Sequence, residues 1–127
     1  MLSWEQFRLS LTDIERPIVD IYRAIARDRK PKQVLEVGSG WGLFARSVLQ
    51  WSDASLVTID KIAELREFSV ATEGFSGRIQ RLIGASYDIL PKIIAGDRRF
   101  DFAMVDGSHR GEDVAFDLEA VWELDLS

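Results

Sequence analysis

The sequence predicts an α/β fold in which helices cover both faces of a parallel sheet, giving three layers. Short apolar, β-prone runs alternate with segments of helical periodicity along most of the chain. Each of these runs ends at a glycine or an aspartate. Alternating strands and helices form βαβ units, so the strands are expected to be parallel. The 127 residues suit a single domain spanning residues 1–127.

Residues 1–30 predict two helices that precede the sheet. Trp4, Phe7 and Leu11 fall on one face of the first helix. Thr12 or Asp13 is expected to cap the second helix, and Pro31 ends it. Basic residues 27–32 then lie at a helix C-terminus, which favours positive charge. The apolar residues at helical spacing in the second helix are Ile14, Ile18, Ile21, Tyr22 and Ile25.

Four strands are expected after this pair of helices, in the part of the chain from residue 31 to 127. They cover residues 33–37, 55–59, 79–83 and 100–105. The helices expected between and after them cover residues 43–51, 62–72, 86–95 and 112–124.

Composition and charge exclude several classes of protein. Sixteen Lys and Arg against twenty-one Asp and Glu give a net charge of −5, which disfavours a nucleic-acid partner. No apolar run is long enough to span a membrane, so no membrane partner is expected. The absence of cysteine excludes disulfides and thiolate metal sites. With no signal peptide recognisable, a cytoplasmic location is expected.

The distinctive polar and glycine residues gather at the expected strand ends. The four strands end at Gly38, Asp60, Gly84 and Asp106. Ligands of open parallel sheets bind outside the carboxyl ends of the strands. The first end carries three glycines, Gly38, Gly40 and Gly42, before a helix whose free N–H groups face the ligand. The sequence therefore predicts a ligand site at this edge.

The spacing of these glycines separates two kinds of nucleotide ligand. A dinucleotide fingerprint needs Gly or Ala three residues after Gly40, where this chain has Leu43. The pattern thus disfavours a pyrophosphate and leaves an NAD-binding domain as a weaker alternative. Asp60, twenty residues after Gly40, is placed to accept hydrogen bonds from ribose hydroxyls. The other interpretation of Asp60 is a cap for the helix that follows.

The segment Glu36-Val37-Gly38-Ser39-Gly40-Trp41-Gly42 resembles motif I of the class I S-adenosylmethionine (SAM)-dependent methyltransferases. The resemblance implies a Rossmann-like domain that binds SAM. It also implies that Glu36 lies beneath the glycine loop, near the methionine amino group. The residues that it implies for cofactor binding are Glu36, Gly38, Ser39, Gly40, Gly42, Asp60 and Lys61.

The end of the third strand departs from the pattern of this family. The family often has an aspartate there that contacts the adenine amino group, and this chain has Ala85. Ala85 and Ser86 are the candidate cofactor-binding residues at this position. Ser86 either replaces the missing contact or caps the following helix.

The segment Asp106-Gly107-Ser108-His109 resembles the Asp-Gly-x-His segment of a methyltransferase branch that includes small-molecule O-methyltransferases. Asp106 is the candidate cofactor contact, catalytic acid and Mg²⁺ ligand, since oxygen ligands suit that ion. His109 is a candidate general base. The alternatives are ordinary turn chemistry for Asp106 and an exposed loop position for His109. Gly111 stands where the branch usually has an aromatic residue.

The resemblance also implies a strand order of 3-2-1-4 and a sheet of seven strands, of which this chain holds four. The fourth strand is then an edge, open to a partner chain or to a second copy. The predicted function is SAM-dependent methyl transfer to a small-molecule hydroxyl. The alternative is a non-catalytic SAM-binding or assembly module, derived from a shortened methyltransferase.

Overall fold

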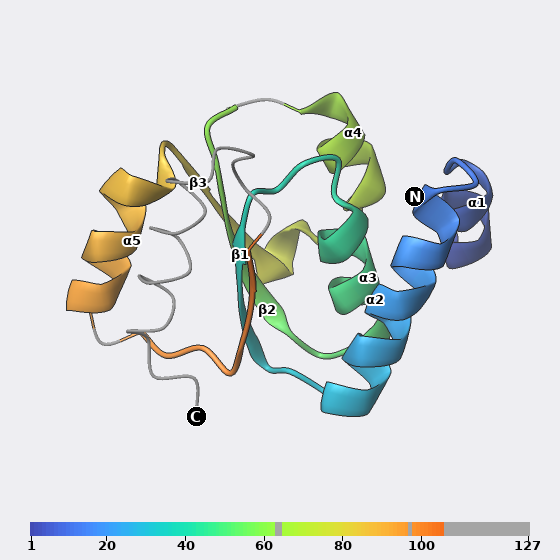
Figure 1. Cartoon of the computed structure of the whole chain (residues 1–127). Helices are drawn as coiled ribbons and strands as arrows, with labels where there is room; N and C mark the ends of the chain where they lie inside the picture. The colour runs from blue at the N-terminus through green and yellow to red at the C-terminus, as the bar shows by residue number, and fades with distance from the viewer. Residues whose placement is uncertain (63–64, 97, 106–127) are drawn as a thin grey trace.

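The four predicted strands form one parallel sheet in the order β3-β2-β1-β4 (Figure 1). The computed structural model describes residues 1–62, 65–96 and 98–105. The strands are β1 (Gln33–Val37), β2 (Ser55–Asp60), β3 (Ile79–Ile83) and β4 (Phe102–Val105). The predicted strand order is confirmed. β1 and β2 pair with Val37 opposite Ile59, so both end at the same edge of the sheet.

Helices lie on both faces of this sheet, which confirms the three-layer architecture. Figure 1 shows α5 on one side of the sheet and the other α-helices on the opposite side. Both predicted N-terminal helices are present. The helices are α1 (Trp4–Leu9), α2 (Glu15–Arg29), α3 (Leu43–Trp51), α4 (Arg66–Ala71) and α5 (Ser86–Ala95), with a 3-10 turn, η1 (Ser76–Arg78), before β3. No helix in the described ranges is both long and apolar enough to cross a membrane.

Alternate residues of the central strands build two separate cores. Val34 and Leu56 face α3 and pack with Phe44. Leu35 and Val57 face the other way and pack with Leu90 of α5. This alternation follows from the two-residue period of a strand. Because both faces are buried, consecutive residues such as Val34-Leu35 and Leu56-Val57 are apolar, which is the pattern that identifies these strands in the sequence.

The starting residues of two elements differ from the predictions. The helix expected from residue 62 begins at Arg66, since Asp60 binds the Ile62 N–H in a turn and Leu65 is extended. The strand expected from residue 100 begins at Phe102, because Phe100 packs in the core. Asp101 accepts hydrogen bonds from the backbone N–H groups that open β1, which a strand pattern does not reveal. The helix expected over residues 112–124 lies outside the described residues.

The second helix is confirmed, and its expected apolar positions are buried in part. Tyr22 packs against the core, and Ile18 and Ile25 are half-buried. Val19 and Ala26 are buried, whereas Ile14 and Ile21 are exposed to solvent. Small residues allow α2 to approach α3, and this packing outweighs hydrophobicity at the other positions.

At the start of α2, the cap position falls on Ile14 and not on Thr12 or Asp13, and Ile14 makes no side-chain capping bond. Thr12, two residues earlier, instead forms reciprocal hydrogen bonds with Glu15. At its end, Lys30 adopts the left-handed conformation, φ 47°, directly before Pro31.

A buried arginine joins the first residues of the chain to α3 and α4. Arg46 is fully buried, and its guanidinium donates to the carbonyl oxygens of Leu2 and Ala71. The same group lies over the ring of Phe7, 5.2 Å from its centroid. Burial lowers the pKa of Arg46. Paired carbonyls satisfy a cation that is costly to bury, so Arg46 fixes α1 against the domain.

An ion pair also joins α1 to α2. The guanidinium of Arg8 donates two hydrogen bonds of 2.8 Å to the carboxylate of Asp20. These bonds lower the pKa of Asp20 below its ordinary 3.8. A carboxyl group whose pKa is lower in the folded chain stabilises the fold above its unfolded pKa. That contribution disappears as the pH falls through the folded pKa.

We predict that Asp20→Asn reduces the acid sensitivity of folding. The free energy of unfolding of the wild-type chain should fall as the pH drops below the ordinary aspartate pKa of 3.8, and the variant should lose less over the same interval. Urea unfolding followed by circular dichroism at a series of pH values measures both. Asp53→Asn, which changes an exposed aspartate, is the control. Equal pH dependence in all three proteins would contradict the assignment.

Candidate functional site

The glycine loop between β1 and α3 adopts backbone conformations that favour glycine. Gly38, Gly40 and Gly42 have φ values of 96°, 52° and 84°. A Cβ on Gly42 would lie 3.2 Å from the Cβ of Ala71 and 3.3 Å from the Cα of Phe68. Gly42 is therefore required by packing as well as by φ. At Gly40 a Cβ would meet nothing within 4 Å, so this part of the loop faces open space.

A chain of buried side chains supports the loop from below. Glu36 and Thr58 are register partners on β1 and β2, and both are buried with Ser39. The Thr58 hydroxyl donates to Glu36 Oε1 at 2.7 Å. The hydroxyls of Ser39 and Thr58 are 2.7 Å apart, so Ser39 donates to Thr58, whose own proton is already used. Glu36 thus lies beneath the loop, as predicted.

The carboxylate of Asp60, at the end of β2, binds the loop backbone. Its Oδ2 accepts from Ser39 N–H at 2.9 Å and from Gly40 N–H at 3.2 Å. Its Oδ1 accepts from Ile62 N–H at 3.0 Å. Lys61 is exposed next to it. The structure therefore brings Glu36, Ser39, Gly40 and Asp60 together at one sheet edge.

The end of β3 contributes a second turn at the same edge. Gly84 N–H donates to Asp60 C=O at 2.8 Å, which ties this turn to the end of β2. Ala85 takes the N-cap position of α5, so Ser86 is the first residue of the helix and the interpretation of Ser86 as its cap is wrong. The reason is that Ala85, not Ser86, has the extended backbone that a cap requires. Tyr87 follows and is 54% exposed.

The predicted catalytic residues lie outside the described residues. Asp106 follows directly after Val105, which pairs with Val37 of β1. The sheet therefore brings the end of β4 beside the beginning of the glycine loop. His109 lies in the same undescribed segment. In the described ranges, no three His, Asp or Glu residues form a cluster that could hold a metal ion.

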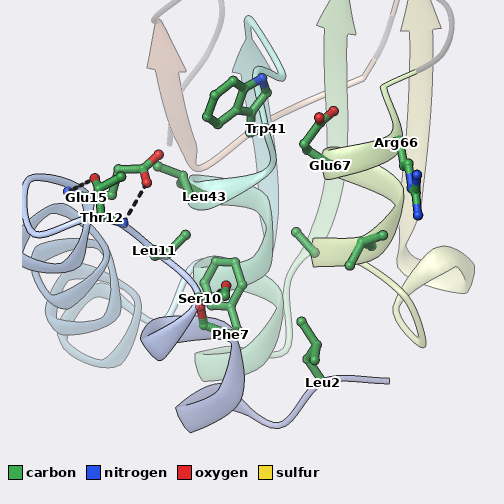
Figure 2. A pocket seen from close by; sticks show the side chains of 12 residues that line it. Leu2, Phe7, Ser10, Leu11, Thr12, Glu15, Trp41, Leu43, Arg66 and Glu67 are labelled. Atoms are coloured by element: carbon green, nitrogen blue, oxygen red, sulfur yellow. Dashed lines mark hydrogen bonds between the residues drawn. The ribbon is translucent and has the colours of Figure 1, made fainter.

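A pocket of about 470 Å³ lies on the helical side of the loop, between α4 and the turn that joins α1 to α2 (Figure 2). Its walls include Phe7, Leu11, Leu43 and Trp41. Trp41 is 58% exposed. None of the three loop glycines lines this pocket, so it is distinct from the polar cluster at the strand ends. Trp51, by contrast, packs edge-on against Trp4.

A comparison with protein-family models decides the family. Residues 35–125 match a family described as "Methyltransferase domain". The chain belongs to this family. The match over residues 35–125 includes the glycine loop, Asp60 and the turn after β3, so the candidate site lies within the matched domain. No curated protein sequence matches the chain significantly.

Solved structures agree with this domain in fold. The SAM complex of the O-methyltransferase TomG from Streptomyces achromogenes, involved in tomaymycin synthesis, has a TM-score of 0.73 at 23% identity and covers 87% of this chain. The SAH-bound methyltransferase PaMTH1 from Podospora anserina has a TM-score of 0.71 at 22% identity and covers 97%. The O-methyltransferase from Bacillus cereus in complex with SAH scores 0.70 at 17% identity and covers 91%.

The methyltransferase domain described here corresponds to about half of those proteins. The aligned part amounts to 51% of the Streptomyces chain, 55% of the Podospora chain and 53% of the Bacillus chain.

Thr58 is the site residue that sequence reasoning missed. A signal was present, because Thr58 is the single polar residue between Leu56 and Ile59 in an otherwise apolar strand. It also precedes Asp60 by two residues, so both side chains lie on one face of β2. Strand propensity alone explains a threonine, which is why its link to Glu36 was not foreseen.

We predict that Thr58→Val destabilises the domain by about 1–3 kcal/mol, because Glu36 loses a donor and Ser39 loses an acceptor in a buried place. Thr72→Val is the matched control. Thr72 is also buried, but its hydroxyl donates to a helical carbonyl that already accepts the Thr72 N–H. Urea unfolding measures both variants. Equal losses of stability would show that the hydroxyl of Thr58 has no special role.

Proposed function

We propose that this methyltransferase domain binds SAM at the carboxyl edge of the sheet and supports methyl transfer to a small-molecule hydroxyl. The single observation that supports this best is the buried Glu36 beneath an open glycine loop, with Asp60 at the adjoining strand end. Two acids at one loop suit a ligand that carries an ammonium and a sulfonium. The SAM and SAH complexes of the similar folds support the same ligand.

Successive residues along the carboxyl edge of the sheet suit successive parts of SAM. The open face of Gly40 leaves room for the methionine part, and Glu36 attracts its amino group from below. Asp60 retains acceptor capacity on Oδ1, which receives one backbone hydrogen bond and can take a ribose hydroxyl. Ala85 and Ser86 form the wall nearest the base, beside the exposed ring of Tyr87.

For methyl transfer, the protein has to orient the reactants more than it has to take part in the chemistry. When bound, SAM supplies a methyl group already activated on sulfur, so proximity and alignment account for most of the acceleration. We assign to Asp106 the orientation of the acceptor, either directly or through Mg²⁺, and to His109 the removal of the hydroxyl proton. The pairing of Val105 with Val37 supports this role for Asp106, because it directs the end of β4 toward the cofactor loop.

The second candidate function is a SAM-binding or assembly module without catalysis. The observation that favours it is that the polar residues brought together in the described ranges, Ser39, Thr58 and Asp60, all hold the glycine loop, which is what binding of a ligand requires. Turnover of hydroxylated small-molecule acceptors with SAM, with and without Mg²⁺, distinguishes an enzyme from such a module.

We predict that the chain binds SAH and that Gly40→Arg abolishes binding while the fold is retained. The new side chain meets no protein atom within 4 Å of its Cβ position, and the left-handed backbone costs about 1–2 kcal/mol. The arginine instead fills the open space above the loop that the ligand is proposed to occupy. Isothermal titration calorimetry measures the affinity, and circular dichroism checks the fold.

Gly77→Arg is the matched control for that variant. Gly77 also has open space around its Cβ position, and its φ is not in the left-handed region. The Gly77→Arg variant adds the same charge in η1, which precedes β3, whereas Gly40 lies in the loop that follows β1. Affinity for SAH that is unchanged by Gly40→Arg would contradict the assignment of the loop. Tighter binding of NAD than of SAH by the wild-type chain would favour a dinucleotide site instead.

We further propose that the edge of β4 pairs with another chain, the simplest partner being a second copy. Among the described strands, β4 pairs with β1 on one side only. Unpaired backbone groups on an edge strand favour association. Sedimentation velocity between 1 and about 50 μM should show a dimer. A stable monomer throughout that range would overturn the proposal.

A further inference from the structure

The N–H groups of the glycine loop are already occupied by acceptors of the protein itself. Gly38 N–H donates to Ile59 C=O at 2.7 Å, and Gly42 N–H donates to Ser39 C=O at 3.2 Å. Between them, the N–H groups of Ser39 and Gly40 donate to one oxygen of Asp60. Four donors of the loop are thus satisfied before any ligand binds.

This arrangement differs from what a loop of this kind offers to an anion. In a strand-glycine-helix connection, backbone N–H groups and the helix N-terminus commonly form a concave site for phosphate. Here a carboxylate lies where a phosphate oxygen would accept those two N–H groups. The negative charge of Asp60, which forms no ion pair within the described part of the chain, then repels a second anion.

We propose that Asp60 is a positioning and specificity residue: its carboxylate fixes the loop through Ser39 and Gly40 and blocks phosphate-bearing ligands from the loop. This role goes beyond a contact with ribose. This role rests on the proposed function in one respect, namely that the ligand which the loop accepts is SAM. A phosphate-free nucleoside that carries positive charge, as SAM does, is compatible with the same loop.

The geometry separates this role from ribose binding. The Oδ2 atom accepts two N–H groups, which uses its two lone pairs, whereas Oδ1 accepts only the Ile62 N–H. Ribose therefore has access to Oδ1, and the loop depends on Oδ2. Because Ser39 is held by Thr58 as well, Asp60 mainly determines where Gly40 lies.

The test uses Asp60→Asn and Asp60→Ala in the full chain, with Asp53→Asn as a control of equal charge change at an exposed position. Amide hydrogen exchange of Ser39 and Gly40 is measured first, since it needs no ligand. Protection of both amides should fall at least about tenfold in the Asp60 variants and stay unchanged in the control. Unchanged protection in Asp60→Ala would overturn the positioning role.

Binding is then measured by NMR titration with three probes: SAH, S-methylmethionine and inorganic pyrophosphate. S-methylmethionine has the sulfonium and the amino acid but no ribose. Asp60→Asn should weaken both SAH and S-methylmethionine, and Asp60→Ala should gain pyrophosphate affinity that the wild-type chain lacks. If only SAH weakens, Asp60 acts on ribose alone and the proposal is wrong.

The two proposals fail in different ways. A wild-type chain that binds neither SAH nor S-methylmethionine contradicts the proposed function. The exchange and pyrophosphate measurements would still decide the role of Asp60 in that case. Pyrophosphate binding by the wild-type chain at the loop amides would contradict the exclusion of phosphate, whatever SAH does.

Discussion

Side chains of β2 bind the glycine loop through hydrogen bonds, and the rest of the site depends on this attachment. Thr58 and Asp60 lie two residues apart, so both side chains extend to the same face of the strand. One binds the side chain of Ser39 and the other binds its backbone N–H. Since β2 is central in the sheet, the loop takes its position from the most deeply buried part of the molecule.

This attachment explains why the site can be open and still be well ordered. Gly40 is exposed and has no neighbour at its Cβ position, which leaves room for a ligand. Its backbone is nevertheless fixed through Asp60, while Gly42 is fixed by close packing on Phe68 and Ala71. The open segment is therefore held from both ends. Preorganised donors and acceptors lose little entropy when a ligand binds.

Much of this could be predicted from the sequence, for physical reasons. β1, α3, β3 and α5 begin and end where the pattern placed them, because buried parallel strands are continuously apolar and the turns need glycine. The position of Asp60 followed from the end of a strand, and that of Glu36 followed from the resemblance to motif I. Contacts between distant residues were not predictable, as Arg46 with Leu2 and Asp101 with Gln33 show. Neither contact produces a periodic pattern in the sequence from which it could be predicted.

The same distinction applies within the site. A motif identifies which residues gather at a strand end, but it does not say what each polar atom already binds. Asp60 illustrates this, because spacing suggested a ligand contact and the structure shows three intramolecular hydrogen bonds. A residue with several acceptor positions can hold the protein and the ligand together. Substitution of Asp60 therefore changes the position of the loop and the contact with the ligand together. Only a ligand that lacks one of these contacts, such as one without ribose, can separate the two roles.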